Sequence, residues 1–313
     1  MQSNIRIPFS IILPAKNEDA AIGSTLSVIK ALYPNSEIIV INDGSTDNTN
    51  KIAKEIATYV LSHPYSKGNG AAIKTGARAA KGDILVFMDA DGQHDPADIS
   101  RLLEKLNDGY DLVVGARDSA SQASPARRIA NGLYNKLASY VTGHKIEDLT
   151  SGFRAVRADK FKEFLYLLPN GFSYPTTSTM AFFRAGYSVA YIPIKAAPRI
   201  GKSHIKLLKD GLRFLLIIFK IGTLYSPLKI FLPISLLFFT TGISYYLYTY
   251  INFNRFTNMS ALMFTTSILI FLIGLISEQI TQLMYISNKT VETDSYNSSI
   301  STSDTKNNNQ GDE

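Results

Sequence analysis

Between about residue 9 and residue 107, short apolar runs alternate with stretches in which apolar residues recur every three or four positions. The first pattern is typical of buried strands and the second of amphipathic helices. Strands are predicted at residues 10–13, 37–41, 58–62 and 84–88, and helices between them at residues 20–33, 47–57 and 70–80. This alternation predicts an α/β domain with a mostly parallel, doubly wound sheet, whose ligands bind at the carboxyl ends of the strands.

Two later stretches stay apolar for much longer. Residues 230–254 and 256–277 contain no Asp, Glu, Lys or Arg. At about 1.5 Å per residue, each is long enough to cross about 30 Å of hydrocarbon as a helix. Two transmembrane helices are therefore predicted, at about residues 228–251 and 259–283.

The charges around these spans predict their orientation. The link between them, residues 252–258, holds only Arg255, whereas the segment before the first span is rich in basic residues. Those residues are Arg199, Lys202, Lys206, Lys209, Arg213, Lys220 and Lys229. Because basic residues concentrate on the cytoplasmic side of membrane proteins, the N-terminal region and the C-terminal tail are predicted to be cytoplasmic.

Two further helices with an apolar stripe are predicted outside the alternating region. One covers about residues 127–142 and starts with Arg127 and Arg128; its stripe suits either the core or a membrane interface. The other, at residues 203–226, is basic on its polar face and leads into the first span, which favours an interfacial position on anionic lipid. Residues 287–313 are rich in Ser, Thr, Asn and Asp, which predicts a disordered tail.

Composition adds a few limits. The 313 residues could form one large domain or two smaller ones. The chain has no cysteine, which excludes disulfides and thiolate metal sites and fits a reducing compartment. No secretory signal peptide is expected ahead of the first strand. The net charge of +6 is mild, and no nucleic-acid partner is expected.

The main candidate chemistry follows the strand at residues 84–88. Asp89 and Asp91 leave its carboxyl end with a spacing that lets both carboxylates face one point, and Gln93 follows. Hard oxygen ligands of this kind suit a divalent cation that is shared with phosphate groups. The alternative is an ordinary acidic loop, since Asp-x-Asp alone is common, but the motifs on both sides favour a site.

The turn after the second predicted strand carries two more acidic residues. Asp47 is predicted to cap the helix that follows, which is the ordinary role of an aspartate at that position. Asp43 comes too early to cap and leaves the strand edge, so a contact with a ribose or a base is expected.

The segment Gly68-Asn69-Gly70 through Gly76 superficially resembles a dinucleotide fingerprint. Ile73 stands where the third glycine is required, and the segment follows the third strand rather than the first. A Rossmann dehydrogenase is therefore disfavoured. The glycines are expected instead to let the Lys67 loop and the next helix approach the donor pocket closely.

In order along the chain, these motifs resemble those of family-2 glycosyltransferases of the GT-A fold, in the dolichyl-phosphate mannose synthase and polyprenyl-phosphate glycosyltransferase branch. The matching segments are residues 13–18, 40–47, 88–96, 114–117, 148–154 and 199–204. The resemblance implies a Rossmann-like GT-A catalytic domain over residues 1–202, the juxtamembrane helix at 203–226, a transmembrane hairpin over 227–286 and assembly as a tetramer.

The resemblance also implies residue roles. A nucleotide-sugar donor of the GDP-mannose or UDP-glucose type would meet Pro14, Ala15, Lys16, Glu18, Ile41, Asp43, Asp89, Ala90, Asp91, Arg117, Arg199 and His204. Mg²⁺ or Mn²⁺ would be held by Asp89, Asp91 and Gln93, and catalysis would rest on these three residues and Arg117. A polyprenyl monophosphate acceptor, dolichyl or undecaprenyl, would meet Arg127, Arg128, Ser151 and Arg154. The eukaryotic mannose synthases carry Tyr in place of Lys16 and Lys in place of His204.

A lipid phosphate is anionic at neutral pH, so the implied transfer needs positioning and charge neutralisation rather than a strong general base. Direct displacement would invert the anomeric carbon. Two other classes compete with this interpretation. A processive polysaccharide synthase would carry a Gln-x-x-Arg-Trp motif, and this chain has no tryptophan. A non-catalytic membrane-anchored nucleotide-sugar binder is disfavoured because the aspartate pair and the arginines are present, while a different lipid or glycan acceptor stays open.

Overall fold

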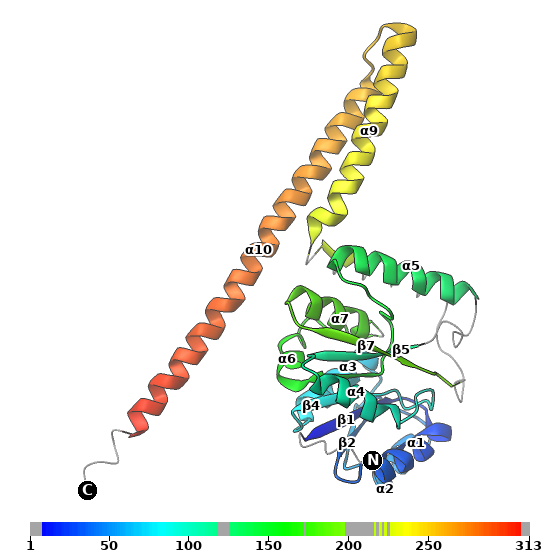
Figure 1. Cartoon of the computed structure of the whole chain (residues 1–313), viewed down its shortest axis with the longest axis vertical. Helices are drawn as coiled ribbons and strands as arrows, with labels where there is room; N and C mark the ends of the chain where they lie inside the picture. The colour runs from blue at the N-terminus through cyan, green and yellow to red at the C-terminus, as the bar shows by residue number, and fades with distance from the viewer. Residues whose placement is uncertain are drawn as a thin grey trace. The chain divides into compact units, whose positions relative to one another are not determined.

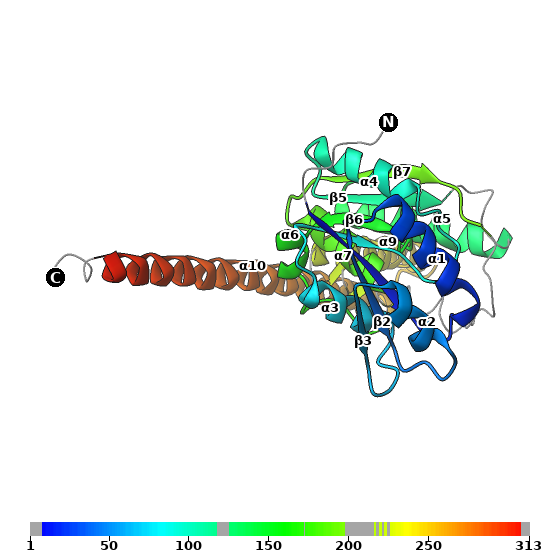
Figure 2. The same cartoon turned by 90° about the horizontal axis from the view of Figure 1, so that it is seen from below.

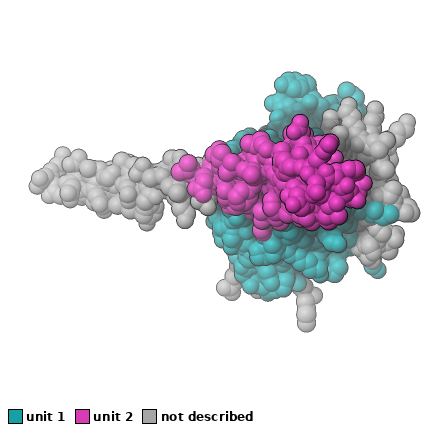
Figure 3. Space-filling model, turned by 90° about the horizontal axis from the view of Figure 1, so that it is seen from above, with its two compact units in different colours: residues 1–221 teal, residues 222–313 magenta. Residues whose placement is uncertain are grey.

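The computed structural model describes residues 8–117, 125–171, 173–197, 216, 219–220, 222–223 and 226–307. The chain divides into two units, residues 1–221 and 222–313, which Figure 3 colours teal and magenta. Most of the helix predicted at residues 203–226 lies outside the described residues.

The first unit is built around one sheet, in the strand order β3-β2-β1-β4-β6-β5-β7 among the described residues (Figures 1 and 2). Its strands are β1 Phe9–Ala15, β2 Glu37–Asn42, β3 Tyr59–Ser62, β4 Ile84–Phe87, β5 Leu112–Arg117, β6 Arg154–Arg157 and β7 Val189–Ile194. Only β6 runs antiparallel to its neighbours, β4 and β5, whereas the other described pairs are parallel. The mostly parallel α/β sheet predicted from the sequence is confirmed.

Helices follow most strands, as expected for a doubly wound fold. In this unit they are α1 Asp19–Leu32, α2 Thr49–Ile56, α3 Asn69–Ala79, α4 Asp98–Asn107, α5 Pro125–Thr142, α6 Ala158–Glu163 and α7 Tyr174–Arg184. The first four strands and first three helices match their predicted ranges to within two residues at each end. The helix predicted at 127–142 is also confirmed as α5, which begins at Pro125, a favoured residue for a first helical position.

The sheet has an apolar core on each face. Side chains that alternate along the strands point to opposite faces, so Ile11 and Ile12 belong to different clusters. The Ile11 cluster includes buried residues of α1, α2 and α4, and the Ile12 cluster includes those of α3, α6 and α7. Because both faces are covered, the polar edge at the carboxyl ends of the strands is the place left for a ligand site.

The second unit contains two long helices, α9 Pro227–Phe253 and α10 Asn258–Asn307. Both are long and apolar enough to cross a membrane, with mean hydropathy 1.6 for Pro227–Phe253 and 2.3 for Asn258–Thr281. These bounds agree with the two spans predicted from the sequence. Their outer faces carry large apolar side chains such as Leu237 and Ile276, which are 64% and 60% exposed.

Small residues form the seam between α9 and α10. They recur every seven positions and are buried: Ser235, Gly242 and Thr249 on α9, and Ser260, Ser267, Gly274 and Thr281 on α10. At the middle of the seam, the Ser235 hydroxyl donates to the Ser267 carbonyl, and the Ser267 hydroxyl donates to the Ser235 carbonyl, each at 2.9 Å. Small side chains let two helix backbones approach closely, and the paired hydroxyls fix their register.

The structure differs from the sequence prediction at the C-terminal end of this unit. A disordered tail is predicted for residues 287–313, but α10 continues as a helix to Asn307. Starting a helix is unfavourable, but each residue added to a helix that already exists gains one hydrogen bond. A sequence with low helix propensity can therefore continue α10.

Candidate active site

Two carboxylates leave the sheet just beyond the end of β4. Asp91 is only 6% exposed, and its Oδ1 accepts a hydrogen bond from the Gln93 amide at 3.2 Å. The Asp89 side chain is more open, at 32% exposed. Gly92 lies between Asp91 and Gln93 with φ +75°, a left-handed conformation that glycine adopts without strain. The turn therefore brings the predicted Asp89, Asp91 and Gln93 to one strand end.

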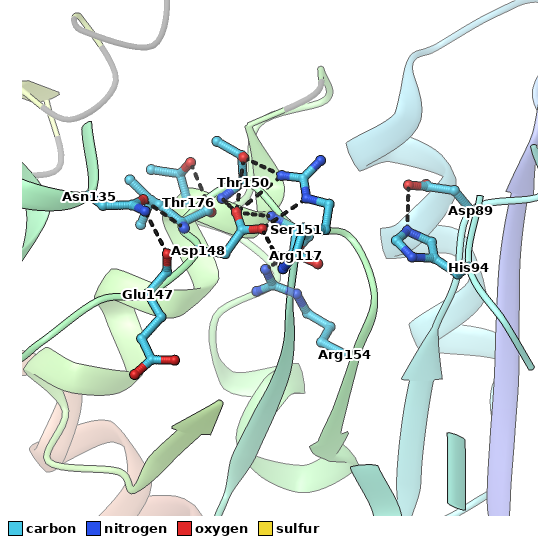
Figure 4. A network of polar contacts seen from close by, with 11 residues as sticks. Asp89, His94, Arg117, Asn135, Glu147, Asp148, Thr150, Ser151, Arg154 and Thr176 are labelled. Atoms are coloured by element: carbon cyan, nitrogen blue, oxygen red, sulfur yellow. Dashed lines mark hydrogen bonds and ion pairs between the residues drawn. The ribbon is translucent and has the colours of Figure 1, made fainter. Parts of the chain in front are cut away.

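His94 closes one side of this turn. Its ring stacks on Phe153, with ring centroids 5.0 Å apart. Its Nε2 lies 3.9 Å from Asp89 Oδ2 (Figure 4). Burial of the imidazole lowers the pKa of His94 from 6.5 to about 4, although the nearby Asp91 carboxylate opposes the shift. His94 is therefore neutral at neutral pH. The sequence alone predicts no role for His94.

Arg117 and Asp148 form a charge pair with two hydrogen bonds at this edge of the sheet (Figure 4). The Arg117 Nε donates to Asp148 Oδ2 at 2.8 Å, its Nη2 donates to Oδ1 at 3.1 Å, and the same Nη2 donates to the Thr150 hydroxyl at 2.6 Å. Asp148 also accepts bonds from the Thr150 and Ser151 amides. This two-point geometry holds the guanidinium in one orientation.

The pair also sets the charge of the site. Burial disfavours the Asp148 carboxylate, but the charge and hydrogen bonds of Arg117 outweigh burial and hold the pKa of Asp148 below its ordinary value. Burial likewise disfavours the guanidinium, yet Asp148, with help from Asp89 and Asp91, raises the pKa of Arg117. Arg117 thus lies within electrostatic range of both carboxylates beyond β4. Asp148 belongs to the matching segment 148–154, but its pairing with Arg117 spans distant segments that sequence patterns do not connect.

The ends of β1 and β2 form the neighbouring part of the edge. Pro14 lies beside Ile41 in the strand register, and Ala15 lies beside Asn42. Lys16 follows on the surface, and its Nζ donates to the Ser66 hydroxyl at 2.9 Å. The Glu18 carbonyl accepts the first helical bond of α1, from Ile22, at 2.9 Å. These donor-site predictions therefore gather at adjacent strand ends.

Asp43 is more deeply placed than predicted. It is 4% exposed, and its two oxygens accept four hydrogen bonds of 2.7 to 2.9 Å from the segment that follows β3. The donors are the His63 ring, the Ser66 hydroxyl and the Lys67 and Gly68 amides. Burial opposes the charged form, but these bonds together lower the pKa of Asp43. The carboxylate holds the Lys67 loop rather than projecting from the strand end toward a ribose.

Asp47 accepts hydrogen bonds at helix N-termini, as expected of a capping aspartate, although the N-cap residue of α2 itself is Asn48. Its Oδ1 accepts from the Thr49 amide at 3.0 Å, and its Oδ2 accepts from the Asp19 amide at 3.2 Å. Thr49 and Asp19 are the first residues of α2 and α1. One carboxylate therefore serves two helix N-termini, where unpaired amides and the helix dipole favour a negative charge.

The glycine-rich segment has a different neighbour from the one predicted. A side chain at Gly68 would collide with the Asn170 carbonyl, and one at Gly70 would collide with the Pro169 carbonyl. The Gly70 and Ala71 amides donate to the carbonyls of Gly171 and Asn170, each at 3.1 Å. The glycines thus let residues 169–171 pack on the start of α3 and cap it. The expected close approach of the Lys67 loop and α3 to the donor pocket stays a prediction.

The predicted acceptor residues do not come together as one surface cluster. Arg154 is 0% exposed: its Nη1 donates to the Pro175 carbonyl at 3.1 Å and to the Ser178 hydroxyl at 2.8 Å. Ser151 is also 0% exposed. Both are therefore core residues, and the predicted contact of Arg154 and Ser151 with a lipid phosphate is corrected. The sequence misleads here because an arginine is rarely buried without a paired carboxylate.

For several other predicted residues, the structure does not describe the side chain or shows it buried in the core. Arg127 and Arg128 belong to the first turn of α5, and their side chains are outside the description. Arg199 and His204 lie outside the described residues altogether. Ile41 is 0% exposed and Ala90 1% exposed, so their side chains fill the core and only their backbones reach the edge.

The residues at the β4 end suit a divalent cation that also has phosphate ligands. Asp89, Asp91 and Gln93 offer hard oxygens of the kind that Mg²⁺ and Mn²⁺ prefer. Within the described part of the chain, no group of three or more His, Cys, Asp or Glu side chains could hold a metal. A cation here would therefore complete its coordination with ligands from a bound molecule, as Mg²⁺ does when it binds through one or two carboxylates and substrate phosphates.

Two family models match the chain. Residues 10–165 match Glycosyl transferase family 2, and residues 226–283 match the GtrB C-terminal hairpin. An uncharacterised protein of Methanocaldococcus jannaschii is 34% identical over 164 residues, covering 50% of this chain and 67% of that protein. A dolichyl-phosphate hexose transferase of Haloferax volcanii is 28% identical over 204 residues, covering 64% and 88%.

A solved structure supports the fold. Glucosyl-3-phosphoglycerate synthase from Mycobacterium tuberculosis, in complex with Mn²⁺, uridine diphosphate and phosphoglyceric acid, superposes with a TM-score of 0.58 at 23% identity. The match covers 69% of this chain and 78% of that one. At this identity the likeness concerns the fold, and it agrees with the sheet and helix layers described above.

Proposed function

The chain belongs to glycosyl transferase family 2, and we propose that it transfers a sugar from a nucleotide-sugar to a polyprenyl monophosphate, with inversion at the anomeric carbon. The donor is of the GDP-mannose or UDP-glucose type, and the acceptor is a dolichyl or undecaprenyl phosphate. The name of the Haloferax volcanii relative, a dolichyl-phosphate hexose transferase, and the match to the GtrB C-terminal hairpin, which covers the two apolar helices, support this acceptor class.

One observation carries the proposal. Asp89 and Asp91, at the end of β4, lie within electrostatic range of Arg117, which Asp148 holds at the end of β5. Two acidic ligands beside one oriented guanidinium suit a nucleoside diphosphate, whose phosphates need both a cation and hydrogen-bond donors. An ordinary acidic loop would not require a buried carboxylate to fix a guanidinium within electrostatic range of it.

Different residues of the site would contact the metal, the donor phosphates and the nucleotide. Asp89, Asp91 and Gln93 would hold Mg²⁺ or Mn²⁺, which supplies positive charge to the leaving diphosphate when bound. Arg117, kept in place by Asp148 and Thr150, donates to the donor phosphates or sugar. Pro14, Lys16 and Glu18 line the nucleotide side, and Asp43 keeps the Lys67 loop in position there.

The acceptor side rests on α5. Ile129 and Leu133 are 74% and 61% exposed on this helix, and Lys136 is exposed beside them. Exposed apolar residues next to basic ones are typical of a helix that lies on an anionic membrane surface. In this proposal α5 meets the lipid surface, Arg127 and Arg128 in its first turn meet the lipid phosphate, and the first unit is cytoplasmic. Assembly as a tetramer remains part of the proposal.

A donor screen tests the function. Full-length protein in membranes is given UDP- and GDP-sugars one at a time, with Mn²⁺ and either a polyprenyl phosphate or the matching polyprenol without phosphate. The expected result is release of nucleoside diphosphate and a glycosylated lipid phosphate, detected by mass spectrometry, with the phosphate-bearing lipid only. Equal release with the phosphate-free polyprenol, or with no lipid, would contradict the proposed acceptor.

A further inference from the structure

The turn formed by Ser151, Gly152 and Phe153 lies directly against Asp89. A Cβ atom added to Gly152 would lie 2.9 Å from Asp89 Oδ2, closer than a side-chain carbon normally approaches. Phe153 stacks on His94, whose Nε2 is 3.9 Å from the same carboxylate oxygen. The Asp89 carboxylate is therefore bounded by the turn on one side and by His94, itself held by the turn, on another.

Every carbonyl of this turn has a hydrogen-bond donor. The Ser151 carbonyl accepts from Arg154 Nη2, the Gly152 carbonyl accepts from the Tyr174 hydroxyl at 3.0 Å, and the Phe153 carbonyl accepts from the Gly115 amide at 2.9 Å. Three consecutive carbonyls held in this way leave the backbone little freedom to move away from Asp89. The turn therefore packs against the Asp89 carboxylate with little freedom to move.

Arg154 and Tyr174 are buried where ordinary packing would favour apolar side chains. They are 0% and 2% exposed, and the Arg154 guanidinium lies 5.7 Å from the centre of the Tyr174 ring. Beyond the turn, Arg154 donates to Ser178 and Thr179 in α7. The described part of the chain contains no ion pair to Arg154 within 4.0 Å. Because burying an unpaired guanidinium is costly, its presence calls for a role that apolar side chains could not fill.

We propose that Arg154 and Tyr174 are positioning residues for the metal site: they clamp the Ser151–Phe153 turn, and Gly152 in that turn sets the place of the Asp89 carboxylate. The proposal rests on the proposed function, because it assumes that Asp89 binds a cation there. In this proposal Arg154 positions the turn that contacts Asp89, whereas the sequence predicts that Arg154 contacts the acceptor phosphate. Mutation of residues that contact the metal ligands, but not the metal, typically lowers metal affinity by about 10- to 100-fold.

Mn²⁺ binding tests the proposal without an activity assay. Full-length protein in detergent micelles is titrated with Mn²⁺ in the presence of UDP or GDP, and free Mn²⁺ is followed by electron paramagnetic resonance. Tyr174→Phe removes one hydroxyl, and Gly152→Ala adds one methyl group beside Asp89. We expect Gly152→Ala to weaken Mn²⁺ binding about tenfold or more and Tyr174→Phe several-fold.

Two matched substitutions serve as controls. Tyr187→Phe also removes a hydrogen-bonded hydroxyl, which donates to Glu163 at 2.8 Å. Gly132→Ala adds a methyl group in α5 with no atom within 4 Å. Both controls should stay within about twofold of the wild-type affinity. If wild-type protein binds Mn²⁺ and both test variants bind it with the same affinity, the positioning role is overturned and the proposed function is not. If wild-type protein binds no Mn²⁺ with either nucleotide, the metal part of the proposed function is overturned with it.

A thermodynamic cycle separates positioning of Asp89 from general damage to the fold. Gly152→Ala should lower the unfolding temperature because its methyl group presses on Asp89. In the Asp89→Ala background that oxygen is gone, so the same Gly152→Ala change should lower the temperature much less. Equal losses in the two backgrounds would mean that Gly152 does not act through Asp89, and would overturn the inference.

Discussion

The two units of the chain bury opposite kinds of residue. In the catalytic unit, residues 1–221, the fully buried side chains are mostly large and apolar, such as Leu26 and Phe87 at 0% exposure. In the hairpin of α9 and α10, the buried residues include Ser235, Ser267 and Gly274, while large apolar side chains cover the outside. The first arrangement draws its stability from removing apolar surface from water, and the second suits a solvent that is itself apolar.

The comparison shows that exposure has a different meaning in each unit. An exposed leucine in the catalytic unit faces water, whereas an exposed leucine in the hairpin would face lipid chains. Helix association in lipid gains little from burying leucine and depends on close packing and interhelical hydrogen bonds, such as the Ser235–Ser267 pair. The same substitution should therefore have unequal effects in the two units.

Leucine-to-alanine changes should show the largest difference between the two units. Leu26→Ala in α1 should lower the unfolding free energy of the catalytic unit by about 2–5 kcal/mol, because it leaves a cavity in a closed core. Leu237→Ala in α9, where the side chain is 64% exposed, should change hairpin stability by less than about 0.5 kcal/mol. Hydrogen exchange of the full chain in detergent, read separately for peptides of each unit, gives both values. Similar losses in the two units would contradict the comparison.

Acidification should weaken the catalytic unit through His94. Its pKa is about 4 in the folded protein and 6.5 in an ordinary environment. Between these values the unfolded chain binds more protons than the folded one, so stability falls as the pH falls from about 6.5 to 4. The loss is on the order of 3 kcal/mol if the full shift is realised. Asp43 and Asp148, whose pKa values are lowered, lose their contribution only at still lower pH, below about 4.

Calorimetry of wild-type protein and His94→Gln at pH 7 and pH 4.5 measures this effect. The wild-type unfolding temperature should fall more steeply between the two pH values than that of the variant, since glutamine does not titrate. Parallel declines in the two proteins would assign the acid sensitivity to other groups.

The smallest of these expected effects concerns the seam of the hairpin. A Cβ atom at Gly274 would lie 2.8 Å from the Phe231 Cβ, so Gly274→Val should force α9 and α10 apart at a cost of about 1–3 kcal/mol. The chain has no cysteine, so Ser235→Cys with Ser267→Cys provides a specific reporter of helix proximity. Adding Gly274→Val should slow disulfide formation several-fold, whereas Ile276→Phe, on the exposed face, should leave the rate unchanged. Unchanged cross-linking with Gly274→Val would mean that close packing does not hold the hairpin.

The sequence predicts the parts of the fold that local patterns determine. Strands β1 to β4 are short, mostly apolar runs bounded by turn residues, and α9 and α10 each contain a long uncharged stretch, residues 230–253 and 258–277, so periodicity and length identify them. Strand β6 escapes prediction because Arg154–Arg157 begins and ends with arginine, and the first of these is fully buried. Its burial depends on α7, which supplies hydrogen-bond acceptors from a later part of the chain.

In the candidate site, the cluster of Asp89, Asp91 and Gln93 is predictable from the sequence, and the contacts that support it are not. Asp89, Asp91 and Gln93 are close in sequence and follow one strand, so their meeting follows from local geometry. The Arg117–Asp148 pair, the Tyr174 contact with Gly152 and the packing of residues 169–171 on α3 join distant segments. A single sequence carries no signal for such contacts beyond the presence of the residue types.

Sugar transfer by Asp91→Ala shows whether the end of β4 is the catalytic site. With the active donor, Mn²⁺ and a polyprenyl phosphate, the wild-type enzyme should form a glycosylated lipid phosphate, and so should Asp108→Ala, which removes an exposed carboxylate paired with Lys105. Asp91→Ala, folded and in the membrane fraction, should retain less than about a tenth of wild-type turnover, a barrier increase of at least about 1.4 kcal/mol. Turnover by Asp91→Ala equal to that of Asp108→Ala would contradict the assignment of this strand end as the catalytic site.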